Sequence, residues 1–206
     1  GASFVPQMAQ VYQPWNLLLL VVPSVEVYGY WYLLHQVLFG WLAYRFFRRI
    51  SCSHGAALIG VVAAVLGLWT QCRVHHNVVL TAALSLWPML SAVHAIARGG
   101  RSRDIAILAV CTGLTWMSGF VVIALQITYL CVGFALLQTM ANQRGNRLWP
   151  LAYCGLGMGL GAMLSSAHML PVLMASSESG RPAMTMANLV GNSLAWDHAL
   201  TFLWPD

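Results

Sequence analysis

Residues 77–103 read NVVLTAALSLWPMLSAVHAIARGGRSR. The first part, residues 77–97, is an apolar run without Asp, Glu, Lys or Arg, and three arginines follow it. A helix needs about 20 apolar residues to cross the hydrocarbon core of a bilayer. Arginine and lysine are enriched in the short loops on the cytoplasmic side of a membrane. This stretch therefore predicts a membrane-spanning helix whose last turn reaches the cytoplasmic side.

The composition of the whole chain agrees with that prediction. Of its 206 residues, 59% are hydrophobic and 7% are charged, whereas a soluble domain carries about 25% charged residues. So little charge cannot cover a surface that faces water, and most of the exterior must contact a lipid bilayer. The ten basic residues are all arginines. They are spread over short loops, which argues against nucleic acid as a partner.

Six apolar runs predict an all-α, polytopic transmembrane helix bundle. We expect membrane helices at about Val27 to Phe47, His54 to Gln71, Asn77 to Ala97, Asp104 to Ser118, Phe120 to Met140 and Leu148 to Met174. A short interfacial helix fits between Pro14 and Pro23, because the eight residues between them span only about 12 Å as a helix. The chain is thus expected to form part of one transmembrane domain. Residues 1–26 are an outer loop with the interfacial helix, 27–174 the six membrane helices, and 175–206 a second outer loop.

The charged residues orient these helices. Eight of the ten arginines fall in alternate loops: Arg45, Arg48, Arg49, Arg98, Arg101, Arg103, Arg144 and Arg147. Four of the five acidic residues fall on the opposite side: Glu26, Glu178, Asp197 and Asp206. Because basic loops face the cytoplasm, we expect both ends of the chain to be extracytoplasmic. The chain begins at Gly1 and ends on Trp204-Pro205-Asp206, and we interpret it as an internal fragment of a longer protein, truncated at both ends.

Two polar groups in the outer loops are candidates for a binding site. Arg73 and His76 follow the second predicted helix. They either cap the headgroup region or contact a lipid phosphate or pyrophosphate, for which arginine is well suited. Glu178, Ser179 and Arg181 follow the sixth predicted helix. The guanidinium of Arg181 can hold an anionic headgroup, or it can anchor the helix end and pair with Glu178.

The helix interiors offer few groups for chemistry. None of the six runs holds Asp, Glu, Lys or Arg in its inner part, which argues against a proton- or sodium-driven carrier. His35, His94 and His168 are isolated there, and a hydrogen-bonded role in helix packing is the simpler interpretation. For His168, substrate binding is the alternative. The sequence has no H-x-x-x-H or C-x-x-C pattern, so we expect no metal site, and no cofactor site is evident.

Small residues and one proline shape the last three predicted helices. Gly155, Gly157, Gly159 and Gly161 form two overlapping G-x-x-x-G pairs, a pattern that allows close helix packing; a substrate groove is the alternative. Ser118-Gly119 is expected to turn the fourth and fifth helices into a tight hairpin. Pro171 is expected to end or kink the sixth helix.

Five collinear pieces of the chain resemble the bacterial YfhO-like membrane proteins, which belong to the wider GT-C class of glycosyltransferases. They are GASFVPQMAQVYQPWNLLLLVVP (1–23), LLHQVLFGWLAYRFFRR (33–49), LSLWPML (84–90), AHMLPVLMASSESGRP (167–182) and SLAWDHALTFLWPD (193–206). Two positions depart from the family pattern: His168 stands in place of a glutamine, and residues 118–121 lack a proline-glutamine pair.

The resemblance implies a fragment of an integral membrane glycosyltransferase in the bacterial cytoplasmic membrane. Such an enzyme transfers a sugar from a polyprenyl-phosphate donor to a cell-envelope glycan or lipid on the extracytoplasmic side, and it can depend on a membrane partner that makes the donor. Its catalytic acid would lie N-terminal to this piece. The residues expected to bind donor phosphate or acceptor are Arg181, Ser179, Glu178, Arg73, His76 and His168. A lipid or polysaccharide transporter and a noncatalytic membrane scaffold are the alternative functions.

Overall fold

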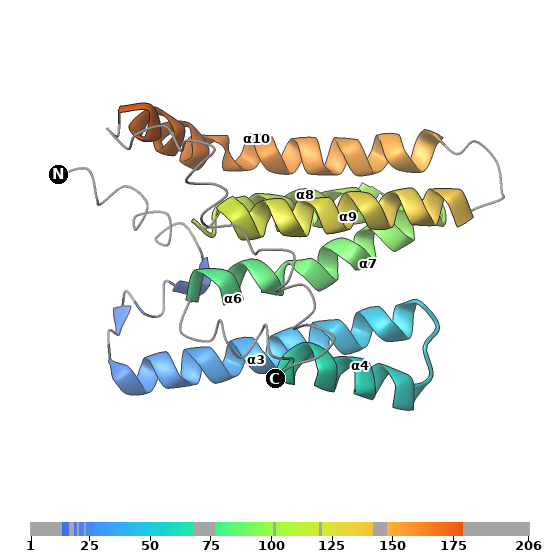
Figure 1. The fold of residues 1–206 in the computed structure, drawn as a ribbon, viewed down its shortest axis with the longest axis horizontal. Helices are drawn as coiled ribbons and strands as arrows, with labels where there is room; N and C mark the ends of the chain where they lie inside the picture. The colour runs from blue at the N-terminus through green and yellow to red at the C-terminus, as the bar shows by residue number, and fades with distance from the viewer. Residues whose placement is uncertain are drawn as a thin grey trace, which may run out of the picture. The chain divides into compact units, whose positions relative to one another are not determined.

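A computed structural model of the protein describes residues 14–16, 19, 21, 22, 24–67, 77–100, 102–119, 121–141 and 148–178, with residues 15, 77, 78 and 172–178 described by their backbone alone. Figure 1 shows the 3-10 turn η2 (Pro14–Asn16) and the helices α3 (Val25–Arg49), α4 (His54–Leu66), α6 (Asn77–Leu84), α7 (Leu86–Ala97), α8 (Ser102–Trp116), α9 (Val121–Ala141) and α10 (Leu148–Glu178). These residues contain no strand, which confirms the all-α fold class. The chain divides into two units, Gly1–Ala175 and Ser176–Asp206, and the packing that follows lies within the first.

Three described stretches are long and apolar enough to cross a membrane: Val79–Ala97, Val121–Ala141 and Leu148–Pro171. They match the third, fifth and sixth predicted membrane helices. Among the described residues, the prediction of six such helices is therefore wrong in number. The predicted interfacial helix is described only at η2 and at residues 19, 21 and 22; its other residues lie outside the described part of the chain.

The remaining three helices, α3, α4 and α8, are too short or not apolar enough to count as membrane spans. α4 and α8 have 13 and 15 residues, about 20 and 22 Å of helix, against a hydrocarbon core of about 30 Å. The predicted second helix extended to Gln71, and its residues 68–71 lie outside the description. α3 is long enough with 25 residues, but its terminal charges and the polar His35 and Gln36 make it less apolar.

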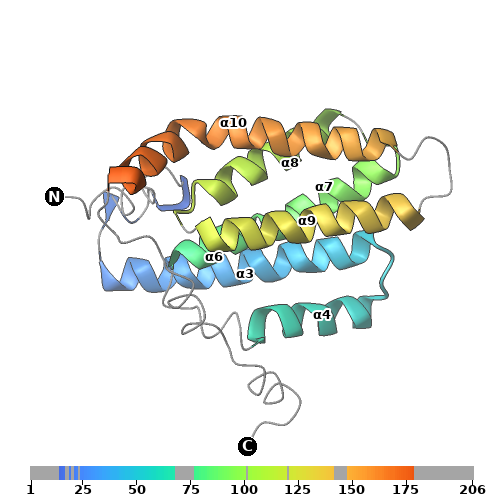
Figure 2. The ribbon, with the colours of Figure 1, turned by 45° about the horizontal axis from the view of Figure 1, so that its top comes forward.

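α3 and α4 form an antiparallel hairpin, and local sequence sets where each helix begins (Figure 2). Ser24 and Ser53 are the N-caps, and each hydroxyl oxygen accepts a hydrogen bond of 3.2 Å from the backbone N–H three residues later. Such a cap contributes about 1 kcal/mol to helix stability. In the turn, Ser51 has a φ of 70°, and Nη1 of Arg48 donates to the carbonyl oxygen of Cys52 at 2.6 Å.

The central apolar segment, residues 77–97, is broken into α6 and α7 at Ser85. Pro88 lies in the first turn of α7 and has no N–H to donate to the carbonyl of Leu84, four residues earlier. At the break, the N–H of Ser85 bonds to the carbonyl of Ala82, three residues earlier, at 3.1 Å. Most of this segment is buried, whereas α9 and α10 are mostly exposed. The segment is therefore the centre around which the other helices pack.

Trp87 joins α3 to the central segment. Its ring centroid lies 5.7 Å from that of Phe39, 5.6 Å from Phe46 and 5.4 Å from Phe47, all on α3. Phe46 in turn lies 5.8 Å from Phe134 of α9. Aromatic pairs at such separations contribute about 0.5–1.5 kcal/mol each beyond the area that they bury. The core continues through Val79, Met89, Val93, Ile96, Leu108 and Ile127.

α8 and α9 form a second antiparallel hairpin, which confirms the predicted turn at Ser118-Gly119. Gly119 has a φ of 83°, a conformation that glycine adopts without steric cost. At the other end of α8, Oδ1 of Asp104 lies 3.6 Å from Nη2 of Arg49. The C-terminal end of α3 therefore meets the start of α8, next to the C-terminal end of α7 (Figure 1). This meeting point, with Arg45, Arg48, Arg49, Arg98 and Arg103, is called the basic end below.

Pro171 does not end the sixth helix. The prediction of a helix end at this residue is therefore wrong. α10 continues past it to Glu178, and Figure 2 shows α10 changing direction toward its C-terminal end. A proline inside a helix removes one backbone hydrogen bond and crowds the carbonyl four residues earlier. A bend toward this end of α10 agrees with the other predicted effect, a kink.

One of the two G-x-x-x-G pairs in α10 lies at a helix contact. A Cβ added to Gly161 would lie 2.5 Å from the carbonyl oxygen of Ala109, and one added to Gly157 would lie 3.0 Å from the side chain of Leu108, both on α8. The other pair meets no described atom within 4 Å. The contact confirms close packing as the role of Gly157 and Gly161. Gly155 and Gly159 make no such contact with the described residues.

The two pairs allow a matched test of this contact. Gly161→Ala should lower the free energy of unfolding by about 1–3 kcal/mol, as overpacking does, because α8 must move away. Gly159→Ala, one helical half-turn away, should leave stability unchanged or slightly higher, since alanine favours a helix. Thermal unfolding of both variants in detergent measures the difference, and equal transition temperatures would contradict the assigned contact.

A second test addresses the aromatic packing. Trp87 is partly buried, so Trp87→Ala should lower the free energy of unfolding by about 2–4 kcal/mol, somewhat less than the cost of removing a fully buried large side chain. Trp149→Ala is the control, because Trp149 on α10 is 58% exposed and should cost little. Denaturant titration followed by circular dichroism measures both, and a similar loss in the two variants would rule out the special role of Trp87.

Candidate functional site

The structure describes the side chain of one of the six predicted binding residues. His168 lies on α10 and is 7% exposed. Glu178 is the last residue of α10, described by its backbone alone. Arg73, His76, Ser179 and Arg181 lie outside the described residues, so their contacts stay a prediction.

The helix directions nevertheless relate the two outer polar groups. α4 begins just after the basic end of α3 and runs away from it. α8 also starts at the basic end, α9 returns to it, and α10 runs away again (Figure 1). The segment after α4 holds Arg73 and His76, and the segment after α10 holds Ser179 and Arg181. Both helices therefore run away from the basic end, but α4 has 13 residues and α10 has 31, so α4 ends closer to it.

The three histidines that the sequence analysis placed within apolar runs are buried. Nδ1 of His35 lies 2.7 Å from the carbonyl oxygen of Trp31, and Nδ1 of His94 lies 3.2 Å from Oε1 of Gln138 on α9. These bonds confirm the packing interpretation for His35 and His94. Within the described part of the chain, no three His, Cys, Asp or Glu side chains are grouped as a metal ion would require.

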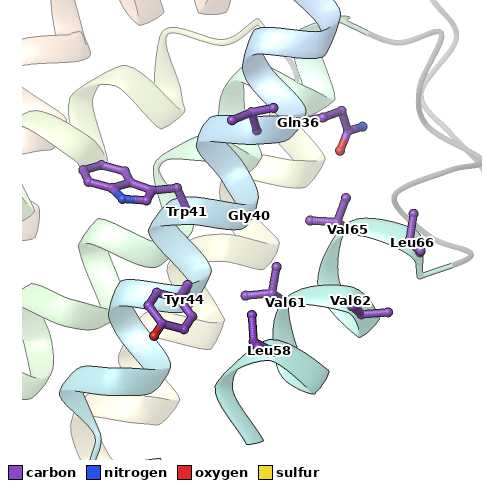
Figure 3. Close-up of a pocket in the computed structure, with 10 residues that line it drawn as sticks. Gln36, Gly40, Trp41, Tyr44, Leu58, Val61, Val62, Val65 and Leu66 are labelled. Carbon is purple, nitrogen blue, oxygen red and sulfur yellow. The ribbon is translucent and has the colours of Figure 1, made fainter. Parts of the chain in front are cut away.

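A groove between α3 and α4 has a volume of about 590 Å³. This volume falls within the range of about 300–1,000 Å³ that is usual for ligand sites. Figure 3 shows its walls, which are almost entirely apolar. The lining residues are Gln36, Val37, Gly40, Trp41 and Tyr44 of α3 and Leu58, Val61, Val62, Val65 and Leu66 of α4.

Two glycines set the distance between the walls of this groove. A Cβ on Gly40 would lie 3.1 Å from Cγ2 of Val65, and one on Gly60 would lie 2.7 Å from the ring of Phe47. Their missing side chains let α3 and α4 approach closely at two points. Beside Gly40 the surface stays hollow (Figure 3), because no large side chain fills that position.

Polar groups lie toward both ends of the groove. At one end, Nε2 of Gln36 donates to the hydroxyl of Tyr32 at 2.7 Å, and Oε1 of Gln36 has no hydrogen-bond partner among the described residues. At the other end, the hydroxyl of Tyr44 lies 2.7 Å from Nδ1 of His54. The lining is thus apolar along its length and polar at its limits.

Charge is distributed unevenly along the α3–α4 hairpin. Glu26 is its one acidic residue and lies in the first turn of α3, whereas Arg45, Arg48 and Arg49 lie in the last two turns. Hydrogen bonds from the backbone of Glu26 and from the hydroxyl of Ser24 lower the pKa of the Glu26 carboxyl. A negative charge is favourable at a helix N-terminus. The hairpin is therefore acidic at one end and basic at the end where its turn lies.

The sequence alone did not predict the groove. Its residues belong to two apolar runs that predicted helices, and no motif separates a groove-lining valine from one that faces lipid. Gly40 and Gly60 were the available signal, because glycine inside an apolar helix often marks a close helix contact. No protein-family model, no curated protein and no solved structure matches this chain, and the resemblance to the YfhO-like proteins rests on the quoted pieces alone.

Proposed function

We propose that this chain is part of a multi-pass integral membrane protein with its basic end in the cytoplasm. Three helices have the length and apolarity to span a bilayer, and many large apolar side chains on α3, α4, α9 and α10 are exposed. A monomeric soluble protein rarely exposes so much contiguous apolar surface to water. The arginines of α3, α7 and α8 share one end, as the positive-inside rule expects.

We further propose that the complete protein is a GT-C-type glycosyltransferase that takes a sugar from a polyprenyl-phosphate donor. The acceptor is a cell-envelope glycan or lipid on the extracytoplasmic side. Arg181 and Arg73 hold the donor phosphates by charge-assisted hydrogen bonds, with Ser179, Glu178 and His76 beside them. The catalytic acid comes from a segment N-terminal to Gly1, and a separate membrane enzyme supplies the donor.

The observation that supports this function best is the common direction of α4 and α10. Both helices run away from the basic end, and Arg73 and Arg181 follow them in the sequence. With the basic end in the cytoplasm, this common direction supports an extracytoplasmic position for both arginines, where they can bind a donor headgroup.

Cysteine labelling tests the orientation. Cys52 lies in the turn at the basic end and is partly exposed. With Cys72 replaced by serine, a membrane-impermeant maleimide should label Cys52 in inverted vesicles and not in right-side-out vesicles. Glu26→Cys, at the exposed start of α3, should show the reverse pattern when Cys52 is also replaced. Labelling of Cys52 from the outside would reverse the proposed topology.

Sugar transfer is tested with the complete protein in proteoliposomes. A polyprenyl phosphate carrying a tritiated hexose is offered as donor, with cell-envelope glycan as acceptor. Arg181→Ala should lower transfer by about tenfold or more, the effect of losing one charge-assisted hydrogen bond. Arg103→Ala, an exposed arginine at the basic end, should leave transfer unchanged. Equal rates for the native protein and Arg181→Ala would return Arg181 to the role of a helix anchor, and a native protein without transfer would favour the scaffold or transporter.

A further inference from the structure

The α3–α4 hairpin exposes a continuous apolar surface that the described residues leave uncovered. Val37 is 68% exposed, Leu58 56%, Val62 55% and Leu66 65%, and all four line the groove. Exposed patches of this kind mark contacts with a membrane or a partner. In a membrane-embedded hairpin, lipid chains are the molecules that reach such a surface first.

The length of the groove matches one leaflet of a bilayer. Its lining runs from Gln36 to Tyr44 on α3 and from Leu58 to Leu66 on α4, about 12 Å along each helix axis. Half of a hydrocarbon core is about 15 Å thick. Tyr44 is one helical turn from Arg48, and Leu58 is one turn from His54. With the hairpin embedded in the membrane, the groove would lie in the leaflet next to the basic end.

The same end of the groove is cationic. Arg45 places its guanidinium carbon 4.9 Å from the centre of the Trp41 ring, and Arg48 is held by its bond to the carbonyl oxygen of Cys52. Arg49, by contrast, faces α8 and pairs with Asp104. No acidic residue of the hairpin lies near Arg45 and Arg48, because Glu26 is at the far end of α3.

We propose that the α3–α4 groove binds one anionic glycerophospholipid of the cytoplasmic leaflet. An acyl chain lies along the valine and leucine side chains between Gly40 and Leu66, and the phosphate lies at the turn, within reach of Arg45 and Arg48. Arginine suits a phosphate because its planar donors match two oxygens at once. Trp41 and Tyr44 stand between the two regions, in the interfacial position that aromatic residues prefer.

The inference depends on membrane embedding and not on sugar transfer. In the proposed function Arg181 binds the donor phosphate on the extracytoplasmic side, whereas the lipid phosphate proposed here lies in the cytoplasmic leaflet. Arg181→Ala should therefore leave lipid binding in the groove unchanged, and Arg45→Gln with Arg48→Gln should leave donor binding unchanged. Failure of either proposal can thus be recognised without the other.

Native mass spectrometry of the complete protein in detergent tests the headgroup. Phosphatidylglycerol and phosphatidylcholine with identical acyl chains are added at equal concentration. The native protein should retain phosphatidylglycerol about tenfold more strongly, as expected for hydrogen bonds to a charged group. The double change Arg45→Gln, Arg48→Gln should abolish this preference. The double change Arg98→Gln, Arg103→Gln removes the same charge from the basic end outside the hairpin and should preserve it.

A second pair of variants tests the groove itself. Val62→Trp places a large ring in the groove and should reduce the retention of both phospholipids. Ile59→Trp is the control, since Ile59 is 73% exposed on the same helix and does not line the groove. Both residues are at the surface, so both variants should fold, and this pair remains informative if an arginine double variant does not.

Four outcomes would overturn the proposal. They are equal retention of the two phospholipids, an equal loss of preference in the two arginine double variants, an equal effect of the two tryptophans, and complete displacement of phosphatidylglycerol by glycerol phosphate. The last would show a site for a free phosphate. Preferential retention of a polyprenyl phosphate over phosphatidylglycerol would likewise overturn it and assign the groove to the sugar donor.

Discussion

The packing of Trp87 against Phe39, Phe46 and Phe47 is the contact on which the arrangement of the described helices most depends. Between helices in lipid, burial of apolar surface drives little, because lipid tails are as apolar as side chains. Close contact of many atoms must supply the attraction instead, and large flat rings supply it efficiently. Through this cluster the α3–α4 hairpin is fixed to α7 and, through Phe134, to α9. Pro88, the next residue, breaks the helix above the cluster and lets α6 follow a separate direction.

Glycine makes two further helix contacts. Gly40 and Gly60 bring α3 and α4 together, and Gly157 and Gly161 bring α10 against α8. In each case the backbone of one helix approaches side chains or carbonyl groups of the other, which a larger residue would prevent. The groove beside Gly40 is a consequence of the same geometry, since two helices that touch at a glycine diverge on either side of it.

The charges divide the bundle into two chemically different ends. The arginines of α3, α7 and α8 gather at one end, and one of them is neutralised by Asp104. Arg73 and Arg181 follow α4 and α10 in the sequence, and we propose them for donor binding on the extracytoplasmic side. In this proposal the protein meets anionic lipid at its cytoplasmic end through the α3–α4 groove and a lipid-linked sugar on its outer side. The two roles need the same residue type, arginine, in two separate leaflets.

The sequence by itself determined the all-α class, the three apolar spans, the turn at Gly119 and the basic character of the end where α3, α7 and α8 meet. These features depend on local composition, run length and glycine chemistry, which a linear chain displays directly. The tertiary structure alone decided that α3, α4 and α8 differ from full membrane spans, that α10 continues past Pro171, and that Gly157 and Gly161 rather than Gly155 and Gly159 meet α8. It also created the groove, because both glycine pairs look alike in sequence, and a wall exists only once two helix faces are opposed. The six residues predicted to bind donor or acceptor follow from chemistry and resemblance, and four of them lie outside the described part of the chain.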